Sequence, residues 1–446
     1  MSTAVVAVIA LALLFGLLLI RVPVGFSLLA SGSLGLLMLD GFEIATRGLA
    51  TEPYTAVAKY SMIVIPMFIL MGMFAMESGV AVGAFRLANK AFGRLPGGLG
   101  IATVVVCAVF AAVSGSSPAT VATVGRITVP EMRRAGYTRE FTAGIVGTAG
   151  TLGVLIPPSI VAVIFGVTTE VSIGALLIAG ILPGLVSVIV LSTYIVVQAV
   201  RNPALINDTS YRPGTEGEEE TAGAGSRRDL FALVGVGVMF TVVIGGIYTG
   251  FFTATESAAF GALTGLLILI VSQARTGRFF SAFLSALREA ASTTTMIFVI
   301  MIGAAVFTNF LVRSGITRMI SDGILGLGLS PYMLVIGTLL LMLPLGMFLD
   351  ATSIIVITMP ILWPVLAASG VDGAWFGIMV IIMIEIGLIT PPVGINGFVL
   401  TGIAEDISIE QTFKGLVPFV FVQLAIVAII FLIPGTATFL PGLMRG

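Results

Sequence analysis

The sequence LITPPVGI, residues Leu388–Ile395, places two consecutive prolines inside a long apolar stretch, and LIPPSI, residues Leu155–Ile160, does the same in the other half of the chain. Proline has no amide hydrogen and its ring clashes with the preceding helical turn, so each pair interrupts a helix and frees nearby carbonyl groups. Such backbone is tolerated at membrane depth only where protein, water or an ion satisfies it. We therefore expect broken helices at 140–168 and 374–402, with a simple kink at each pair as the alternative.

The composition around these breaks is that of a membrane protein. The chain has 446 residues, of which 58% are apolar and 10% are charged, and its mean hydropathy is +1.16. A water-soluble domain carries about 25% charged residues, so a soluble enzyme is excluded. The 54 glycines and 20 prolines lie largely inside apolar segments, where lipid-embedded helices tolerate them. The sequence thus predicts an all-α polytopic membrane protein.

Two residue types limit the chemistry. The chain has no histidine and a single cysteine, Cys107, which excludes imidazole ligands, Ser-His and Cys-His nucleophile pairs, internal disulfides and thiolate metal sites. An intramembrane hydrolase is the alternative from another class, but a rhomboid-like protease needs histidine and an aspartyl protease needs a second deep aspartate beside Asp350. We expect no enzymatic activity, no cofactor, no metal other than sodium and no nucleic-acid partner.

A spanning helix needs about 20 predominantly apolar residues, and ten segments of the sequence meet that criterion. They are approximately 3–20, 23–39, 61–77, 140–168, 172–200, 230–250, 253–273, 292–312, 374–402 and 415–438. Two further apolar stretches, 97–130 and 331–367, are broken in the middle by turn residues. We interpret both as re-entrant hairpins that enter and leave on one side of the membrane, the alternative being two ordinary spans each.

The basic residues orient the chain, because cytoplasmic loops carry an excess of Lys and Arg. When the N-terminus is placed outside, 16 of the 21 Lys and Arg residues lie in or near the cytoplasm. The five on the outer side are Arg47, Lys59, Arg313, Arg318 and Arg445. A hairpin and a pair of spans have the same parity, so this distribution supports the orientation without proving the hairpins. The hydrophilic stretch 201–229 reads as a cytoplasmic linker, and segments 44–60 and 277–291 read as interfacial helices.

Landmarks recur across the linker at a shift of about 230 residues and in one order. Besides the Pro-Pro pairs, they are Ser78-Gly79-Val80 with Ser314-Gly315-Ile316, Pro96 with Pro331, and Val129-Pro130 with Met359-Pro360. An odd number of crossings separates equivalent points, so the two halves are expected to be inverted repeats, which are typical of secondary transporters with a site near the midplane. The hairpin 97–130 then enters from the cytoplasm and 331–367 from the outside, and their tips bracket one site.

The first hairpin turns at Ser114 and the following GSSPATVATVG, residues 115–125. Glycine and serine let the backbone leave helical geometry, and Pro118 suits the first turn of the returning arm. Exposed amides at a helix start favour an anion, whereas freed carbonyls and hydroxyls favour a cation such as sodium. The hydroxyls are those of Ser114, Ser116, Ser117 and Thr120. The alternative is close helix packing through small residues.

The second hairpin turns at GMFLDATS, residues Gly346–Ser353. Asp350 is a carboxylate in an otherwise apolar run, and an intramembrane acid is by default a functional-site hypothesis. We favour a cation site near Asp350, Thr352 and Ser353. Asp350 can equally act as the N-cap of the returning arm, and both roles can hold together.

The Pro-Pro breaks supply the remaining polar groups. They are lined by Thr151, Gly153, Gly387, Thr390, Gly394 and Asn396. Glu385 precedes the second break, and burying it unpaired costs several kcal/mol, so a partner or protonation is expected. Ion binding and structural pairing with an arginine or a backbone amide both remain open for Glu385.

GSSPATVATVG, LIPPSI, GMFLDATS and EIGLITPPVGING (Glu385–Gly397), in that order over nearly the whole chain, resemble the large membrane subunit of tripartite ATP-independent periplasmic (TRAP) transporters, the DctM-like family. The resemblance implies an elevator-type transporter in the bacterial inner membrane, N-terminus periplasmic, in which sodium drives import of an organic acid anion. It also implies two partners, a small DctQ-like membrane subunit and a DctP-like periplasmic binding protein that delivers the substrate.

The resemblance also assigns segments and residues. It implies scaffold segments at 1–60, 172–200, 230–291 and 403–446, transport segments at 61–171 and 292–402, and the linker at 201–229. Carried over by position, the expected sodium ligands are Ser114, Gly115, Ser116, Ser117, Gly153, Pro157, Gly346, Asp350, Thr352, Ser353 and Thr390. The expected substrate-binding residues are Ser116, Thr120, Pro158, Asp350, Pro392 and Asn396, with Glu385 as a further candidate.

A stand-alone sodium/divalent-anion symporter is the alternative within transport, although the Ser-Asn-Thr hairpin signature of that group is absent here. The substrate stays open among C4-dicarboxylates, sugar acids, keto acids and sulfonates. Sodium coupling has a physical rationale: a dianion entering a cell against about 100 mV is opposed by about 2.3 kcal/mol per charge. Co-transported cations must therefore outnumber the negative charges if the voltage is to help.

Overall fold

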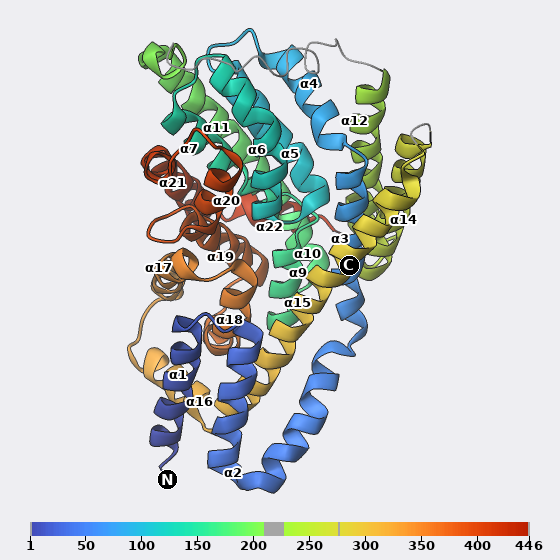
Figure 1. Ribbon diagram of the computed structural model, residues 1–446. Helices are drawn as coiled ribbons and strands as arrows, with labels where there is room; N and C mark the ends of the chain where they lie inside the picture. Colours follow the sequence, from blue (N-terminus) through green and yellow to red (C-terminus); the bar gives the residue numbers. More distant parts are fainter. Residues whose placement is uncertain (1, 209–226, 275–276, 445–446) are drawn as a thin grey trace.

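The computed structural model describes residues 2–208, 227–274 and 277–444, and they fold almost entirely into helices (Figure 1). No β-strand occurs within those ranges. The predicted all-α architecture is confirmed. Residues 209–226 of the predicted linker lie outside the described residues.

The first half runs from the N-terminus to the linker. Its helices are α1 (Thr3–Leu19), α2 (Val24–Val57), η1 (Tyr60–Ile63), α3 (Val64–Glu77), α4 (Val80–Phe92), α5 (Gly98–Ser114), α6 (Ser117–Arg134), α7 (Arg139–Ala149), α8 (Leu152–Leu155), α9 (Ile160–Thr169), α10 (Ile173–Ala179), α11 (Ile181–Arg201) and η2 (Pro203–Leu205).

The second half follows the linker. Its helices are α12 (Arg227–Phe240), η3 (Thr241–Gly245), α13 (Gly246–Tyr248), α14 (Ala254–Gln273), α15 (Phe279–Arg313), α16 (Ile316–Gly326), α17 (Pro331–Phe348), α18 (Ala351–Ala368), α19 (Gly373–Leu388), α20 (Ile395–Ile403), α21 (Ile409–Leu432) and α22 (Gly435–Gly442).

Eight helices of the described chain are long and apolar enough to cross a membrane, or up to nine when a bent pair counts as one span. The bent pair is Arg139–Leu155 with Ile160–Thr169, which meet at 46° at the first Pro-Pro break. Both arms of the second hairpin, at 18 residues each, also pass this test of length and composition. The chain is a multi-pass membrane protein, and the re-entrant course of the hairpins stays a prediction.

Helices α2 and α15 form the most extensive helix contact among the described residues, with α15 running diagonally beside the bent α2 (Figure 1). Gly41, whose φ of 80° is left-handed, bends α2 between the predicted span 23–39 and the predicted interfacial helix 44–60. The two helices can approach closely at Gly25 and Gly32 because glycine has no side chain. A Cβ at either position would lie only 2.8 Å from atoms of α15.

Several boundaries differ from the sequence expectation. Segments 277–291 and 292–312 are one continuous helix, α15, because no proline or glycine interrupts the sequence between them. The expected span 415–438 is instead α21, which begins earlier at a Ser408 capping box, followed by the separate α22 after Pro434. The amphipathic helices α4 and α16 were not expected, since neither contains a long apolar run.

The hairpins and broken helices pack crosswise. In each half, the first arm of the hairpin packs on the first part of the broken helix in the same half: α5 on α7 and α8, and α17 on α19. The returning arm packs on the second part of the other half's broken helix, α6 on α20 and α18 on α9. Residues from both halves therefore surround one central region.

Candidate functional site

The first hairpin reverses at the glycine and serine that the sequence singled out. Gly115 ends α5 in the left-handed conformation, with φ 62°, and Ser116 is extended before α6 begins at Ser117. Pro118 occupies the first turn of α6, where its missing amide hydrogen leaves no helical bond unmade. The helix is thus discontinuous at the expected turn.

Two of the hydroxyl groups at this turn make hydrogen bonds within the turn itself. Ser114 Oγ and Thr120 Oγ1 are 2.8 Å apart, and Thr120 Oγ1 donates to the Ser116 carbonyl at 2.8 Å. Thr120 is fully buried, so its hydroxyl meets a solute only if the turn opens. Ser116 is half-buried, and its side chain caps no amide of α6.

The first break packs directly against this turn. A Cβ on Gly153 would collide with Thr120 Oγ1 and lie 2.8 Å from the Ser116 carbonyl oxygen, and a Cβ on Gly115 would lie 3.1 Å from the Pro158 carbonyl oxygen. The helix stops after Leu155 and resumes at Ile160, so the interruption predicted at the two prolines is confirmed. Pro157 and Pro158 are both buried, and both breaks contain a cis bond between their prolines.

The second hairpin reverses at Leu349 and Asp350. Asp350 is the N-cap of α18: its carboxylate accepts from the Ser353 amide at 3.0 Å and also from the Ser353 hydroxyl. The capping role is therefore confirmed, while cation binding by Asp350 stays a prediction. Ser353 is fully buried and Thr352 is half-buried one residue before it.

The second break lies against the second hairpin. A Cβ on Gly346 would lie 2.6 Å from the Ile384 carbonyl oxygen, and the Gly394 amide donates to the Met347 carbonyl at 3.3 Å. Thr390 Oγ1 donates to the Ile386 carbonyl at 2.5 Å, so its hydroxyl oxygen keeps lone pairs for a cation. Pro392 is exposed at this break.

One hydrogen bond joins the two halves at the centre. Asn396 Nδ2, at the start of α20, donates to Ser117 Oγ, at the start of α6, at 3.3 Å. Both side chains are fully buried. The second break thus contacts both hairpins, through Asn396 on one side and Gly394 on the other.

Glu385 of α19 is buried beside the Ser117 hydroxyl. Neither of its carboxyl oxygens has a hydrogen bond of good geometry within the described residues, and neither does Asn396 Oδ1. Pairing with an arginine or a backbone amide, left open by the sequence, is therefore not what the described structure shows. Three buried oxygen atoms that only accept hydrogen bonds, when Glu385 is ionised, lie in this region.

Sequence reasoning missed another buried bond between the halves. Gln423 Nε2 of α21 donates to Thr151 Oγ1, beside the first break, at 2.7 Å, and both groups are buried. The available signal was a glutamine within the apolar run that follows Lys414 in α21, because a polar side chain in such a run usually pairs inside the bundle.

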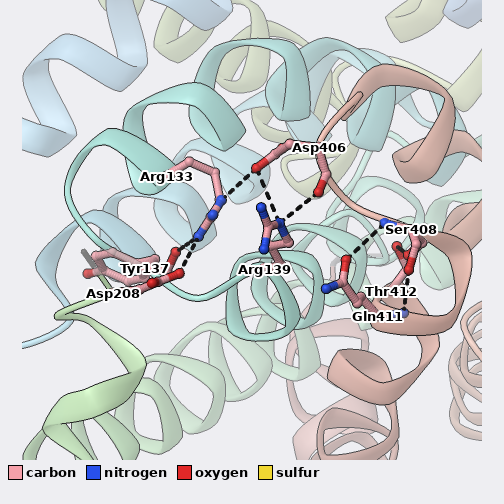
Figure 2. A network of polar contacts seen from close by, with 8 residues as sticks. All are labelled: Arg133, Tyr137, Arg139, Asp208, Asp406, Ser408, Gln411 and Thr412. Carbon is pink, nitrogen blue, oxygen red and sulfur yellow. Dashed lines mark hydrogen bonds and ion pairs between the residues drawn. The ribbon is translucent and has the colours of Figure 1, made fainter. Parts of the chain in front are cut away.

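A buried arginine network was also missed (Figure 2). Arg133, at the end of α6, donates through Nε to Asp406 at 2.8 Å and through Nη1 to Asp208 at 3.2 Å and to the Tyr137 carbonyl. Arg139 Nε donates to the Asp406 carbonyl at 2.8 Å. This network joins the first hairpin to the loop after α20 and to the segment after α11.

The structure does not bring every predicted residue together. Within the described ranges no hydrogen bond links Asp350 to the first hairpin, so the two tips meet only through the second break. Nor do those ranges hold a group of three or more Cys, Asp or Glu side chains that would suit a transition metal.

The fold and this centre define a polytopic helical membrane protein with two hairpins and two discontinuous helices, an arrangement typical of secondary transporters. Residues 11–436 match the family described as tripartite ATP-independent periplasmic transporter, DctM component, and the chain belongs to that family. It is the large permease subunit of a TRAP transporter and not an enzyme, as the sequence motifs predicted.

Individual relatives agree with this family. The C4-dicarboxylate TRAP transporter large permease protein DctM of Pseudomonas aeruginosa is 38% identical over 93% of each chain. The isethionate TRAP transporter permease protein DctMQ of Oleidesulfovibrio alaskensis is 35% identical over 87% of this chain and 59% of that one. The YdaH transporter of Alcanivorax borkumensis shares the fold, with a TM-score of 0.64, 14% identity and 90% of each chain covered.

Proposed function

We propose that this subunit imports an organic acid anion together with sodium ions, by an elevator movement in the inner membrane. The observation that carries the proposal is the pair of contacts at the second break, Asn396 with Ser117 and Gly394 with Met347. They hold the turns of both hairpins, one from each half of the chain, against the second break. A symmetric site at the meeting of two repeats is what alternating access requires.

The residues present suit sodium. The two turns and two breaks offer hydroxyls, carbonyls and carboxylates, and hard cations prefer oxygen ligands. The sodium ligands we propose are Ser114, Gly115, Ser116, Ser117, Gly153, Pro157, Gly346, Asp350, Thr352, Ser353 and Thr390. The oxygens of Glu385 and Asn396 Oδ1 have no hydrogen bond of good geometry within the described residues, which makes Glu385 a further candidate cation ligand.

The anion would lie between the hairpin tips, near Ser116, Asp350 and Asn396. No lysine or arginine stands at either tip, so its negative charge would be met by bound sodium and by the starts of α6 and α20. Loading sodium first would therefore raise the affinity for the anion. The other substrate-binding residues that we propose are Thr120, Pro158 and Pro392.

The crosswise packing supports an elevator. Because α6 packs on α20 and α18 packs on α9, both hairpins and both broken helices form one interlocked unit that can move as a body. We propose that 61–171 and 292–402 are this transport part, and that 1–60, 172–200, 230–291 and 403–446 form the scaffold.

The proposed partners are a small DctQ-like membrane subunit and a DctP-like periplasmic binding protein. A relative named DctMQ that is longer than this chain supports the first. The relatives carry names of a C4-dicarboxylate and a sulfonate transporter, so we assign the substrate to the class of small organic anions with a carboxylate or sulfonate. The N-terminus would face the periplasm.

Reconstitution tests the proposal. The chain, its small subunit and its binding protein are placed in liposomes with radiolabelled organic anion, and an inward sodium gradient is compared with an equal potassium gradient. We expect uptake only with sodium and only with all three proteins. Equal uptake in both gradients would remove sodium coupling, and full uptake by this chain alone would favour the stand-alone symporter.

A further inference from the structure

A cavity of about 620 Å³ lies between the part of α2 that follows the bend at Gly41 and helices α9, α15 and α18. Most of its wall is apolar. Its polar groups come from α2 and α15, from Thr168 on α9, and from Lys59, which lies between α2 and η1. A cleft of this size, apolar with a few placed polar groups, is typical of a small-molecule site.

Three charged side chains, Glu52, Lys59 and Arg313, line the wall, and their partners differ. Glu52 accepts from Asn309 Nδ2 at 2.5 Å, and Arg313 donates to Asn309 Oδ1 at 2.8 Å while pairing with Asp40 at 3.2 Å. Lys59 has no ion pair or hydrogen bond through its side chain within the described part of the chain. The cavity therefore presents an ammonium group beside apolar surface, which suits an organic anion.

Lys59 also borders a second cavity of about 610 Å³, which shares Val167 of α9 with the first. Its wall contains several hydroxyl residues, Ser172 and Thr253 among them, and one acid, Glu170, which is exposed. The first cavity also has one acid, Glu52, but its wall carries two cations, Lys59 and Arg313, whereas Lys59 is the one cation among the lining residues of the second. The excess of positive charge favours the anion in the first cavity.

The first cavity is close to the proposed transport site. Its wall includes Val356 of α18, six residues after the Asp350 cap, which is about 9 Å along the helix axis. It also includes Val167 of α9, the helix that begins directly after the first break. The same two helices that line the cavity lead to the second tip and to the first break.

We propose that this cavity is an outer vestibule in which Lys59 holds the carboxylate or sulfonate of the incoming anion before the anion reaches the hairpin tips. The inference rests on the proposed function for its direction of transport. The phosphate of a lipid headgroup is also an anion that Lys59 could bind. However, polar side chains of α2 and α15 interrupt the apolar wall beside the lysine, and such a wall suits a small polar solute better than the acyl chains of a lipid.

Cysteine protection tests the vestibule directly, because the one native cysteine, Cys107, is fully buried. Ala56→Cys places a thiol in the cavity wall with Lys59 intact, and Thr51→Cys places one on the same part of α2 at an exposed position outside the cavity wall. Cells carrying the complete transporter are treated with a membrane-impermeant maleimide, with and without succinate, isethionate, pyruvate or gluconate. We expect at least one anion to slow labelling of Ala56→Cys at least threefold and to leave Thr51→Cys unchanged.

The lysine is tested in the same background. Adding Lys59→Gln should abolish the protection, and adding Lys59→Arg should keep it. In uptake assays Lys59→Gln should raise KM about tenfold with little change in the maximal rate. Protection by none of the four anions, or protection unaffected by Lys59→Gln, would overturn the vestibule.

Two further outcomes separate the alternatives. Protection in nanodiscs that depends on anionic lipid and not on added solute would assign the site to a lipid headgroup and overturn the proposal. Protection by solute without any sodium-dependent uptake would keep the vestibule and remove the proposed function, whereas sodium-driven uptake without protection would do the reverse.

Discussion

Asn396 donates its amide hydrogen to the Ser117 hydroxyl at 3.3 Å, across 279 positions of sequence, and both side chains are fully buried. The bond fastens the start of α20 to the start of α6, so two helix N-termini meet beside the Glu385 carboxyl. Partial positive charge at both helix starts favours negative charge between them. This contact brings two distant turns of the chain together.

Asn396→Ala should therefore impair sodium use more than it impairs folding. Losing one buried hydrogen bond costs about 1–3 kcal/mol, and we expect the sodium concentration for half-maximal uptake to rise about tenfold. Sodium-titrated uptake in liposomes and thermal unfolding in detergent measure the two effects. Asn202→Ala removes an exposed side-chain amide whose bond within the described residues is to Gln198, and it serves as the control. An unchanged sodium titration in Asn396→Ala would exclude the central site.

Two substitutions of Asp350 separate its capping role from its charge. Asparagine caps a helix about as well as aspartate, whereas alanine at an N-cap costs about 0.5–2 kcal/mol. Asp350→Asn should keep the thermal midpoint but lose sodium-dependent uptake severalfold, and Asp350→Ala should lower both. If Asp350→Asn transports like the parent protein, Asp350 is a cap only.

Gly153→Ala tests the close approach of the first break to the first hairpin. The added methyl group would collide with Thr120 Oγ1 and crowd the Ser116 carbonyl, and overpacking of this kind costs about 1–3 kcal/mol. Uptake should fall at least tenfold in liposome assays. Gly337→Ala adds a methyl group to α17 where nothing lies within 4 Å, so it should leave uptake unchanged. Equal behaviour of the two variants would contradict the packing.

The proline pairs show how far the sequence reaches. A missing amide hydrogen is a local property, so the interruptions at Leu155–Ile160 and Leu388–Ile395 follow from the residues alone. The same holds for the turn at Gly115 and for the cap at Asp350, where short polar residues favour leaving the helix. The amphipathic helices α4 and α16 were not predicted, because a search for long apolar runs does not detect helices in which charged residues alternate with apolar ones.

Contacts between distant segments could not be derived in the same way. Nothing local to Asn396 or Glu385 says that Ser117 lies beside them, since that depends on how α6 packs on α20. The sequence places Lys59 among the basic residues on the outer side of the membrane and gives no sign of the cavity that it lines. Arg133 was likewise counted only among the cytoplasmic charges, although its side chain is 1% exposed.

That arginine gives the last prediction. Removing one partner from a buried ion pair costs about 3–5 kcal/mol, and because Asp208 and Asp406 are partly exposed we expect about 2–4 kcal/mol for Arg133→Met. Thermal unfolding in detergent should show a clear fall in the midpoint. Arg134→Ala breaks only a surface pair with Glu131, which is worth about 0–1 kcal/mol. Adding Asp406→Asn to Arg133→Met should restore a small part of the loss, since it neutralises one of the two carboxylates left behind, although Asp406 still lies 3.7 Å from Arg139. Two fully additive losses would show that Arg133 and Asp406 are not coupled.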